Sequence, residues 1–248
     1  MACYRDEHLS LAGEVLFPWV DQTVLMTTEG SPRRAAFMRE LLRFRPTRRV
    51  VIQVNATFAR CLKPGIRSAA EDIVHSTRRA LRFGGYTLLL EDDVEFHPRV
   101  RRVAKDIRVA RDGVFSLGAS LILATPGRFP HVLLGAHAHA LLFGPVAAAA
   151  LRVQPQRTHL DFWLPLIVQT RTYWQPLAAQ KLVASPASGQ LVCRQLQMAL
   201  FAADRDPWRF YAVSHACAQL GGFAPALLLV LGLGLLAVGH ARNLALWK

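Results

Sequence analysis

Three consecutive carboxylates, Glu91, Asp92 and Asp93, directly follow the apolar run at residues 86–90. Neighbouring carboxylates repel one another, and they are costly near a core unless a cation neutralises them. Oxygen-rich sites of this kind suit Mg²⁺ or Mn²⁺, which also bridge substrate phosphates. The triplet therefore indicates a divalent metal site for a phosphorylated ligand. An acidic turn that caps a helix from Pro98 is the open alternative.

The surrounding pattern predicts where this triplet lies. Apolar runs at residues 23–27, 50–54 and 86–90 predict buried strands, and residues 31–45 and 68–83 between them predict helices. Continuous apolar strands that alternate with helices favour an α/β fold with a mostly parallel sheet between helices. Ligands of such sheets bind beyond the carboxyl ends of the strands, which is where the triplet stands.

Later elements follow with weaker patterns. We expect a basic helix at 98–112, strands at 114–117, 121–123, 131–134 and 138–143, a short helix at 145–152 and a strand at 172–177. The expected domain organisation is an N-terminal extension at 1–20, a catalytic domain at 21–205 and a membrane anchor at 206–248.

The C-terminal part of the chain predicts a membrane helix. No Asp, Glu, Lys or Arg occurs between Arg209 and Arg242. Residues 223–241 are apolar and long enough to cross a hydrocarbon core, which takes ~20 residues. A buried core helix is the alternative. Because the charged N-terminus lacks a signal-like apolar run, we expect a single-pass C-terminal anchor, with a helix at about 221–241 and the main domain in the cytosol.

The net charge limits the classes of partner, and the cysteine spacing limits the roles of the thiols. The net charge of +13, from 30 basic and 17 acidic residues, favours an anionic partner such as lipid headgroups or a phosphorylated substrate. No nucleic-acid-binding motif is present, so we expect no nucleic acid partner. The cysteines lack metal-like or disulfide-framework spacing and are expected to be reduced thiols: Cys3, Cys61, Cys193 and Cys217.

Five stretches between residues 23 and 185 form an ordered set of motifs. They read EDIVHS at 71–76, YTLLLEDDVEFHP at 86–98, GAHAHA at 135–140 before Gly144-Pro145, HLDFWL at 159–164, and YWQP at 173–176 with Gln180 and Ser185. This set resembles glycosyltransferase family 25, whose bacterial lipopolysaccharide enzymes and collagen galactosyltransferases carry an LEDD-type acidic motif. The His75-Ser76 pair stands in the reverse of the family's order.

The resemblance implies a GT-A-like fold. It implies transfer of a sugar from a nucleotide-sugar donor, UDP-galactose or UDP-glucose, to a hydroxyl of a glycan, lipid or protein acceptor, with inversion. It also implies that Glu91 and Asp93 form a D-x-D-type pair for Mn²⁺ or Mg²⁺, with Asp92 on the ribose or beside the metal. Such a metal stabilises the charge that builds on the leaving nucleoside diphosphate.

Residues beyond the triplet complete the expected site. An inverting transfer needs a base for the acceptor hydroxyl, and Asp161 is the candidate because it follows the His-rich strand and precedes a helix. An N-cap role for Asp161 is equally open. His137 and His139 lie two positions apart and so share a strand face. We expect His139 to complete the metal shell, and a structural histidine is the alternative.

The end of the first predicted strand is expected to hold the donor. Thr27, Thr28 and Glu29 stand there, where this fold commonly holds the nucleotide. Arg33 follows in the first turn of a predicted helix, where the helix dipole disfavours a cation. A nearby anion such as the donor diphosphate would explain this position, whereas a solvated basic face is the alternative.

Two other functions fit parts of the sequence. One is a non-catalytic, membrane-tethered basic protein with a degenerate glycosyltransferase fold that binds anionic lipid or glycan; the intact acidic triplet argues against it. The other is a glycosidase with paired carboxylates. Glu91 and Asp93 are too close in sequence to flank a sugar from opposite sides, which disfavours the glycosidase.

Overall fold

The computed structural model describes residues 3–56, 61, 69–153, 164–165, 167–180 and 207–219. Seven strands form the main sheet: β1 (Tyr4–Ser10), β2 (Gln22–Thr28), β3 (Arg49–Asn55), β4 (Thr87–Glu91), β6 (Gly113–Ala124), β7 (Val132–Phe143) and β8 (Gln169–Thr172). Their order is β1-β3-β2-β4-β7-β6-β8. A separate two-stranded sheet pairs β5 (Val94–Phe96) with β9 (Ala178–Gln180).

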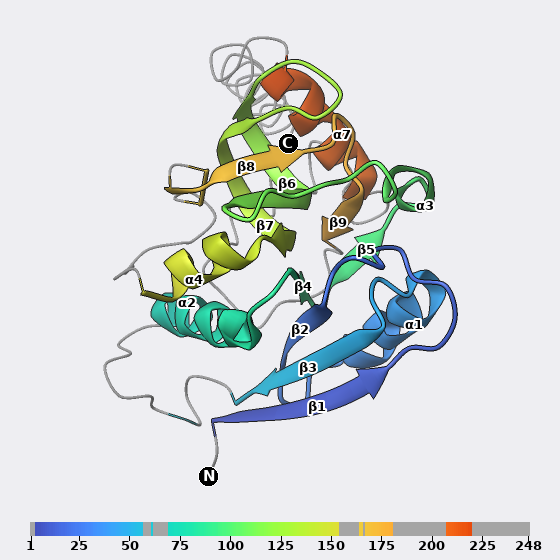
Figure 1. Cartoon of the computed structure of the whole chain (residues 1–248), viewed down its shortest axis with the longest axis vertical. Coiled ribbons are helices and arrows are strands. Elements are labelled where there is room, and N and C mark those ends of the chain that lie inside the picture. Colours follow the sequence, from blue (N-terminus) through green and yellow to red (C-terminus); the bar gives the residue numbers. More distant parts are fainter. Residues whose placement is uncertain are drawn as a thin grey trace, which may run out of the picture.

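Helices accompany this sheet (Figure 1). They are α1 (Arg34–Phe44), α2 (Ala69–Ala80), the 3-10 turn η1 (Leu81–Phe83), α3 (Val100–Val103), α4 (Pro145–Val153) and α7 (Pro207–Gln219). Strands β3, β2, β4, β6 and β8 run in one direction, and β1 and β7 run in the other. The expected α/β class with a largely parallel sheet is therefore confirmed.

Strand alternation divides the interior into two cores. Leu25 and Leu90 face the core that contains α1 and α3, whereas Val24 and Leu89 face the core that contains η1 and α4. All four side chains are at most 5% exposed. Because both faces of the sheet are covered, the central strands read as continuous apolar runs.

The segment assigned to an N-terminal extension supplies the edge strand β1. It pairs antiparallel with β3 along its whole length, from Tyr4 opposite Asn55 to Ser10 opposite Arg49. Its sequence, YRDEHLS, is mostly polar because an edge strand leaves much of its surface exposed, so no apolar pattern marks it. A disulfide joins Cys3 to Cys61, where reduced thiols were expected. Among the described residues, Cys217 is free.

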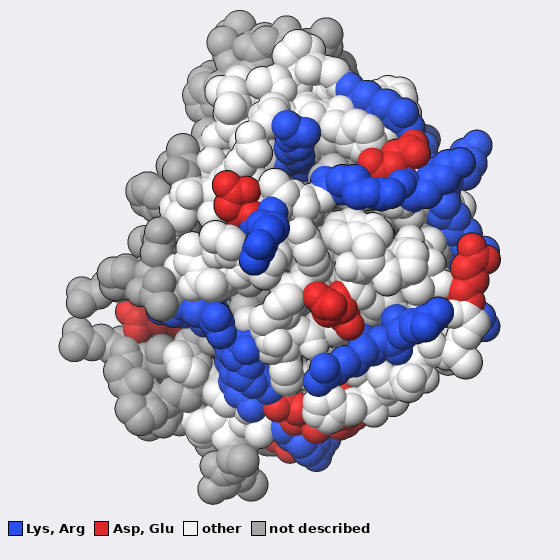
Figure 2. Space-filling model, in the orientation of Figure 1, with Lys and Arg blue, Asp and Glu red and all other residues white. Residues whose placement is uncertain are grey.

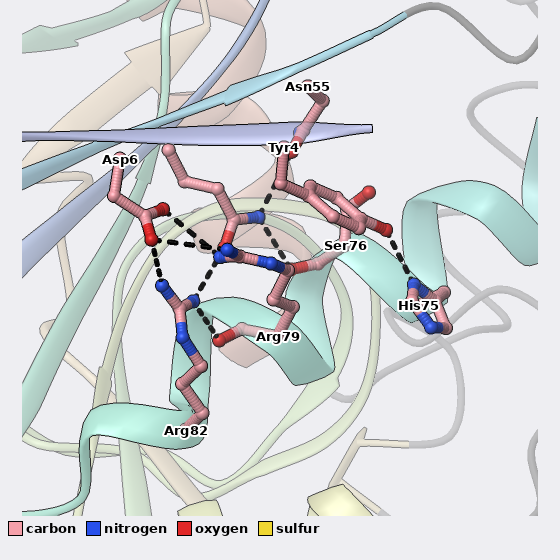
Figure 3. A network of polar contacts seen from close by, with 8 residues as sticks. Tyr4, Asp6, Asn55, His75, Ser76, Arg79 and Arg82 are labelled. Atoms are coloured by element: carbon pink, nitrogen blue, oxygen red, sulfur yellow. Dashed lines mark hydrogen bonds and ion pairs between the residues drawn. The ribbon is translucent and has the colours of Figure 1, made fainter. Parts of the chain in front are cut away.

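A polar network fastens β1 to α2 and η1 (Figure 3). The two carboxylate oxygens of Asp6 accept hydrogen bonds from Arg79 at 3.0 and 3.1 Å, and Arg82 donates to the same carboxylate. Both arginines also donate to Oε1 of the fully buried Gln53 at 3.1 Å. The amide nitrogen of Gln53 donates to the Ser76 carbonyl at 2.9 Å. The network therefore ties the edge strand to α2 and η1 through charge-assisted hydrogen bonds.

Several helical and strand predictions are wrong in detail. In the helix predicted at 68–83, the apolar Ile73 is 52% exposed, whereas its neighbour Val74 is buried. The expected basic helix at 98–112 is the single turn α3. The strand expected at 172–177 is shifted, because β8 ends at Thr172 and β9 starts at Ala178.

The C-terminal helix α7 packs against β6, where the sequence suggested only a transition into the membrane segment. Tyr211 and His215 on this helix are buried. Within the described part of the chain, no helix combines the length and apolarity that a membrane crossing requires. The predicted helix at about 221–241 lies outside the described residues.

Candidate functional site

Asp92 and Asp93 form the turn between β4 and β5, at the carboxyl end of β4. The Thr27 hydroxyl at the end of β2 donates to Asp92 Oδ2 at 2.5 Å, and the Ser31 hydroxyl donates to the same oxygen at 2.6 Å. Because β2 and β4 are parallel neighbours, their carboxyl ends meet at one edge of the sheet. This edge therefore gathers polar groups from two strands and the following loop.

Arg33 supplies the positive charge of this cluster. It is the N-cap residue of α1, and its Nη1 pairs with Asp93 Oδ2 and lies 3.6 Å from Asp92 Oδ1. From β9, Gln180 Nε2 donates to Asp93 Oδ2 at 3.0 Å. The Arg33 side chain is 12% exposed, and those of Asp92 and Asp93 are 8% and 5% exposed. One guanidinium thus serves two buried carboxylates.

Burial of Asp93 dominates its pKa despite the nearby Arg33. Burial raises the pKa of Asp93 to about 6, and this outweighs the lowering by Arg33 and by the Gln180 hydrogen bond. The charge of Asp92 raises the pKa further. Asp93 is therefore poised to gain or lose a proton close to neutral pH, as many functional carboxylates are.

A pocket of about 120 Å³ opens beside these residues. Its lining combines charged and apolar groups: Pro32, Arg33, Ala36, Phe37, Glu40, Asp92, Asp93 and Val94. Asp93 Oδ1 and Arg33 Nε are buried and find no hydrogen-bond partner in the described part of the chain. An unsatisfied buried polar group costs about 1–3 kcal/mol, so a ligand that satisfies both would be favoured. A hydroxyl does so, because it donates and accepts at once.

The structure brings together four of the residues expected at the site: Thr27, Arg33, Asp92 and Asp93. Thr28 ends β2, and Glu29 follows it with an exposed side chain. Asp161 and the side chain of His137 lie outside the described residues.

Glu91 takes a different direction from the two aspartates. It is the last residue of β4, paired with Met26 of β2. Strand alternation places it on the same face as Leu89, toward the core that contains α4, whereas Asp92 is bonded to Thr27 and Ser31. Strand alternation therefore separates the direction of Glu91 from that of Asp92.

The metal ligands expected from the sequence are Glu91, Asp93 and His139, all of which are described. Among the described residues, no group of three or more His, Cys, Asp and Glu is arranged to hold a metal ion. His139 is 2% exposed, and its ring meets Tyr211 of α7 edge-on, with 5.2 Å between the ring centroids. The cation beside Asp92 and Asp93 is Arg33. A metal held by Glu91, Asp93 and His139 stays a prediction.

Two contributors were not assigned to the site from sequence. Ser31 was read only as a helix start, yet its hydroxyl bonds Asp92 and also accepts from the Arg33 backbone N–H at 3.3 Å. Gln180 lies 87 residues from Asp93 along the chain. A polar residue that ends a short buried strand was the available signal, since Ala178 and Ala179 before it are fully buried.

Comparison with models of protein families gives no match, and comparison with curated proteins gives none. The residues of the site therefore carry the functional argument.

Proposed function

We propose that the protein is a glycosyltransferase with a GT-A-like fold that transfers a sugar from a nucleotide-sugar donor to an acceptor hydroxyl. One observation carries the proposal: two adjacent aspartates are buried beside a pocket at the carboxyl end of β4, and Asp93 Oδ1 has no hydrogen-bond partner among the described residues. In parallel α/β sheets this edge is the usual place for a ligand.

The site residues fit the hydroxyl-rich part of such a donor. A ribose or sugar hydroxyl that enters the pocket would donate to Asp93 Oδ1 and accept from Arg33 Nε, which satisfies both buried atoms. Ala36, Phe37 and Val94 would contact the apolar face of the ring. Thr27 and Ser31 hold Asp92 in place through their hydrogen bonds. This role needs only the chain's own residues.

The proposed reaction is a single displacement. The acceptor oxygen bonds to the anomeric carbon while the bond from that carbon to the diphosphate oxygen breaks, so the nucleoside diphosphate leaves with the electron pair. The acceptor proton passes to a carboxylate, for which Asp161 remains our proposal. Attack from the face opposite the leaving group inverts the configuration.

Donor turnover tests this proposal. The full chain would be given UDP-, GDP- and CMP-sugars, with and without Mn²⁺, and sugar release or transfer would be measured. We expect Asp93→Asn to lower turnover at least about 100-fold, the size of effect seen when a key polar group of a reaction site is removed. Asp112→Asn, which changes an exposed acid, is the matched control and should stay near wild type. Absence of turnover with every donor would overturn the proposal.

A non-catalytic role is the second candidate, and one observation favours it. Arg33 already neutralises part of the charge on Asp92 and Asp93, at the place where a reactive metal was expected. Such a degenerate transferase would bind an anionic lipid or a glycan without turning it over. Calorimetric binding of a nucleotide sugar that remains intact after prolonged incubation would favour this candidate over the enzyme.

We also propose the C-terminal membrane anchor at about 221–241. The compartment of the main domain is a separate question, for which the Cys3–Cys61 disulfide matters. Disulfides persist in oxidising compartments and are rare in the cytosol, so this bond favours the oxidising side of the membrane over the cytosolic placement expected from sequence. Alkylation of thiols in intact cells separates the two, because a cytosolic domain would expose Cys3 and Cys61 to the reagent.

A further inference from the structure

The β6–β7 hairpin projects far beyond the carboxyl end of β4. β4 pairs with β7 only from Thr87 opposite Phe143 to Leu90 opposite Ala140. The remaining β7 residues, 132–139, continue past the acidic turn. At about 3.3 Å per strand residue, this projection is roughly 25 Å long. The hairpin tip, residues 124–132, therefore lies at the same end of the sheet as the candidate site and extends beyond it.

Helix α7 follows the hairpin to this tip. Tyr211 contacts His139 at the base of the projection, and Ala218 packs with Ala124 and Val132 at its end. Figure 1 shows α7 beside β6 at the end of the molecule remote from the N-terminus. The last described residue of α7, Gln219, therefore lies at the hairpin tip.

The predicted membrane segment follows α7 closely along the chain. Residues 220–222 separate Gln219 from the apolar run at 223–241. An extended chain gains at most about 3.6 Å per residue, so residue 223 is within roughly 14 Å of Gln219. A helix that crosses the bilayer from this point brings the bilayer surface to the tip.

The tip carries an exposed aromatic residue beside a cation. Trp174 is 44% exposed. Its backbone carbonyl accepts a hydrogen bond from Gln219 Nε2 at 3.0 Å, and its backbone N–H donates to the Arg128 carbonyl at 3.1 Å. The Arg128 guanidinium lies over the Phe129 ring, 5.3 Å from its centroid. Tryptophan and arginine are typical of the membrane–water interface. The connection to Gln219 places this pair where the membrane segment begins.

A basic surface adjoins the tip. Arg128 pairs with Asp106 at 2.5 Å. The chain around Asp106 presents exposed cations: Arg101, Arg102, Lys105 and Arg108. Figure 2 shows basic side chains gathered at the upper right of the molecule, on the side where Figure 1 places α3. Each cation near an anionic membrane surface contributes about 1 kcal/mol of attraction.

We propose that the hairpin tip rests on the bilayer surface, with Trp174 in the interface and the basic surface toward anionic headgroups. The acidic turn at the carboxyl end of β4 then faces the membrane side of the domain. This orientation rests on the predicted anchor and on the contacts of α7, and it is independent of the chemistry proposed for the site.

Fluorescent labels at two positions test the orientation. The full chain with C193S and C217S, which keeps the Cys3–Cys61 bond, would carry an NBD label at W174C or at I73C. Ile73 is a matched control because it is 52% exposed on α2, which Figure 1 places away from both the tip and α3. In vesicles of phosphatidylcholine and phosphatidylglycerol with doxyl-labelled lipid, we expect quenching at position 174 to exceed that at position 73 at least twofold. Carbonate extraction of the same samples reports whether the protein is anchored in the bilayer.

Quenching tests the orientation, and carbonate extraction tests the anchor. Equal quenching at positions 174 and 73 in carbonate-resistant protein would support the anchor and overturn the orientation. Release by carbonate would remove the anchor and the orientation together. If W174C does not fold, a label at R128C serves instead, since the Arg128 side chain is 58% exposed. Donor turnover, measured separately, does not affect either result.

Discussion

Two arginine–aspartate clusters lie on opposite faces of the same sheet and differ in charge balance. At β1, two arginines serve one carboxylate, and both oxygens of Asp6 accept hydrogen bonds. At the acidic turn, one arginine serves two carboxylates, and Asp93 Oδ1 has no partner in the described part of the chain. The first cluster is saturated, whereas the second is short of one cation or hydrogen-bond donor.

The pKa values of the two clusters move in opposite directions. Burial alone would raise the pKa of Asp6, but the hydrogen bonds and charges of Arg79 and Arg82 outweigh it and hold the pKa below its usual range. Burial wins at Asp93 and raises its pKa to about 6. A buried ion pair is therefore weak evidence of function on its own; the unsatisfied group marks the functional candidate.

The largest expected effect comes from removing the only cation beside the acidic turn among the described residues. Arg33→Met leaves two buried carboxylates without it and should lower the free energy of unfolding at pH 7 by about 3–5 kcal/mol. Arg43→Met is the matched control, because Arg43 is 55% exposed and its ion pair with Glu40 is 3.7 Å long. Chemical denaturation measures the free energy of unfolding of both variants. The double variant R33M/D93N removes one of the two unpaired carboxylate charges and should recover much of the lost stability.

At the saturated cluster, Asp6→Asn should cost about 2 kcal/mol, because two arginines lose a charged acceptor. The folded pKa of Asp6 lies below its unfolded value, so this stabilisation is complete above the unfolded pKa and disappears as pH falls through the folded pKa. The cost of D6N should therefore shrink in acid. Denaturation at pH 7 and pH 3 measures it, and a cost independent of pH would contradict the assigned charge balance.

Asp93→Asn should behave in the opposite way. The folded pKa of Asp93, about 6, lies above the model value of 3.8, so the folded protein binds the proton more tightly and loses stability as pH rises from about 4 to 6. D93N removes this loss and should be about 1–2 kcal/mol more stable than wild type at pH 7.5, with little difference near pH 4. Thermal unfolding across this pH range gives the sign of the stability difference between D93N and wild type. If D93N is less stable than wild type at pH 7.5, the contrast between Asp93 and Asp6 is wrong.

The smallest expected effect concerns Gln180. Gln180→Leu removes the hydrogen bond that lowers the pKa of Asp93, so that pKa should rise further. The stability cost should be about 1 kcal/mol, the usual value for one hydrogen bond. Carboxyl ¹³C chemical shifts titrated against pH report the change directly. An unchanged Asp93 titration would show that β9 does not tune the site.

The sequence predicted features that depend on local patterns. Alternating apolar strands and helices located β4 and the acidic turn, and helix-start chemistry near Ser31 drew attention to Arg33. Features set by distant pairing were missed. β1 has no apolar pattern because it is an edge strand, and Gln180 reaches Asp93 only because β9 pairs with β5. Strand alternation, not adjacency, decides which face a side chain joins, so the sequence neighbours Glu91 and Asp92 need not lie on the same face.

The geometry of the site depends on Gly118 of β6, although this glycine takes no part in its chemistry. A Cβ at this position would overlap the carbonyl oxygen of Ala178 and approach His139 Nε2, so any larger residue would push β9 away from β6. Gln180 ends β9, and its contact with Asp93 would open with that shift. In a saturation mutagenesis screen, position 118 should therefore score as intolerant as the aspartates themselves, although it carries no functional group at all.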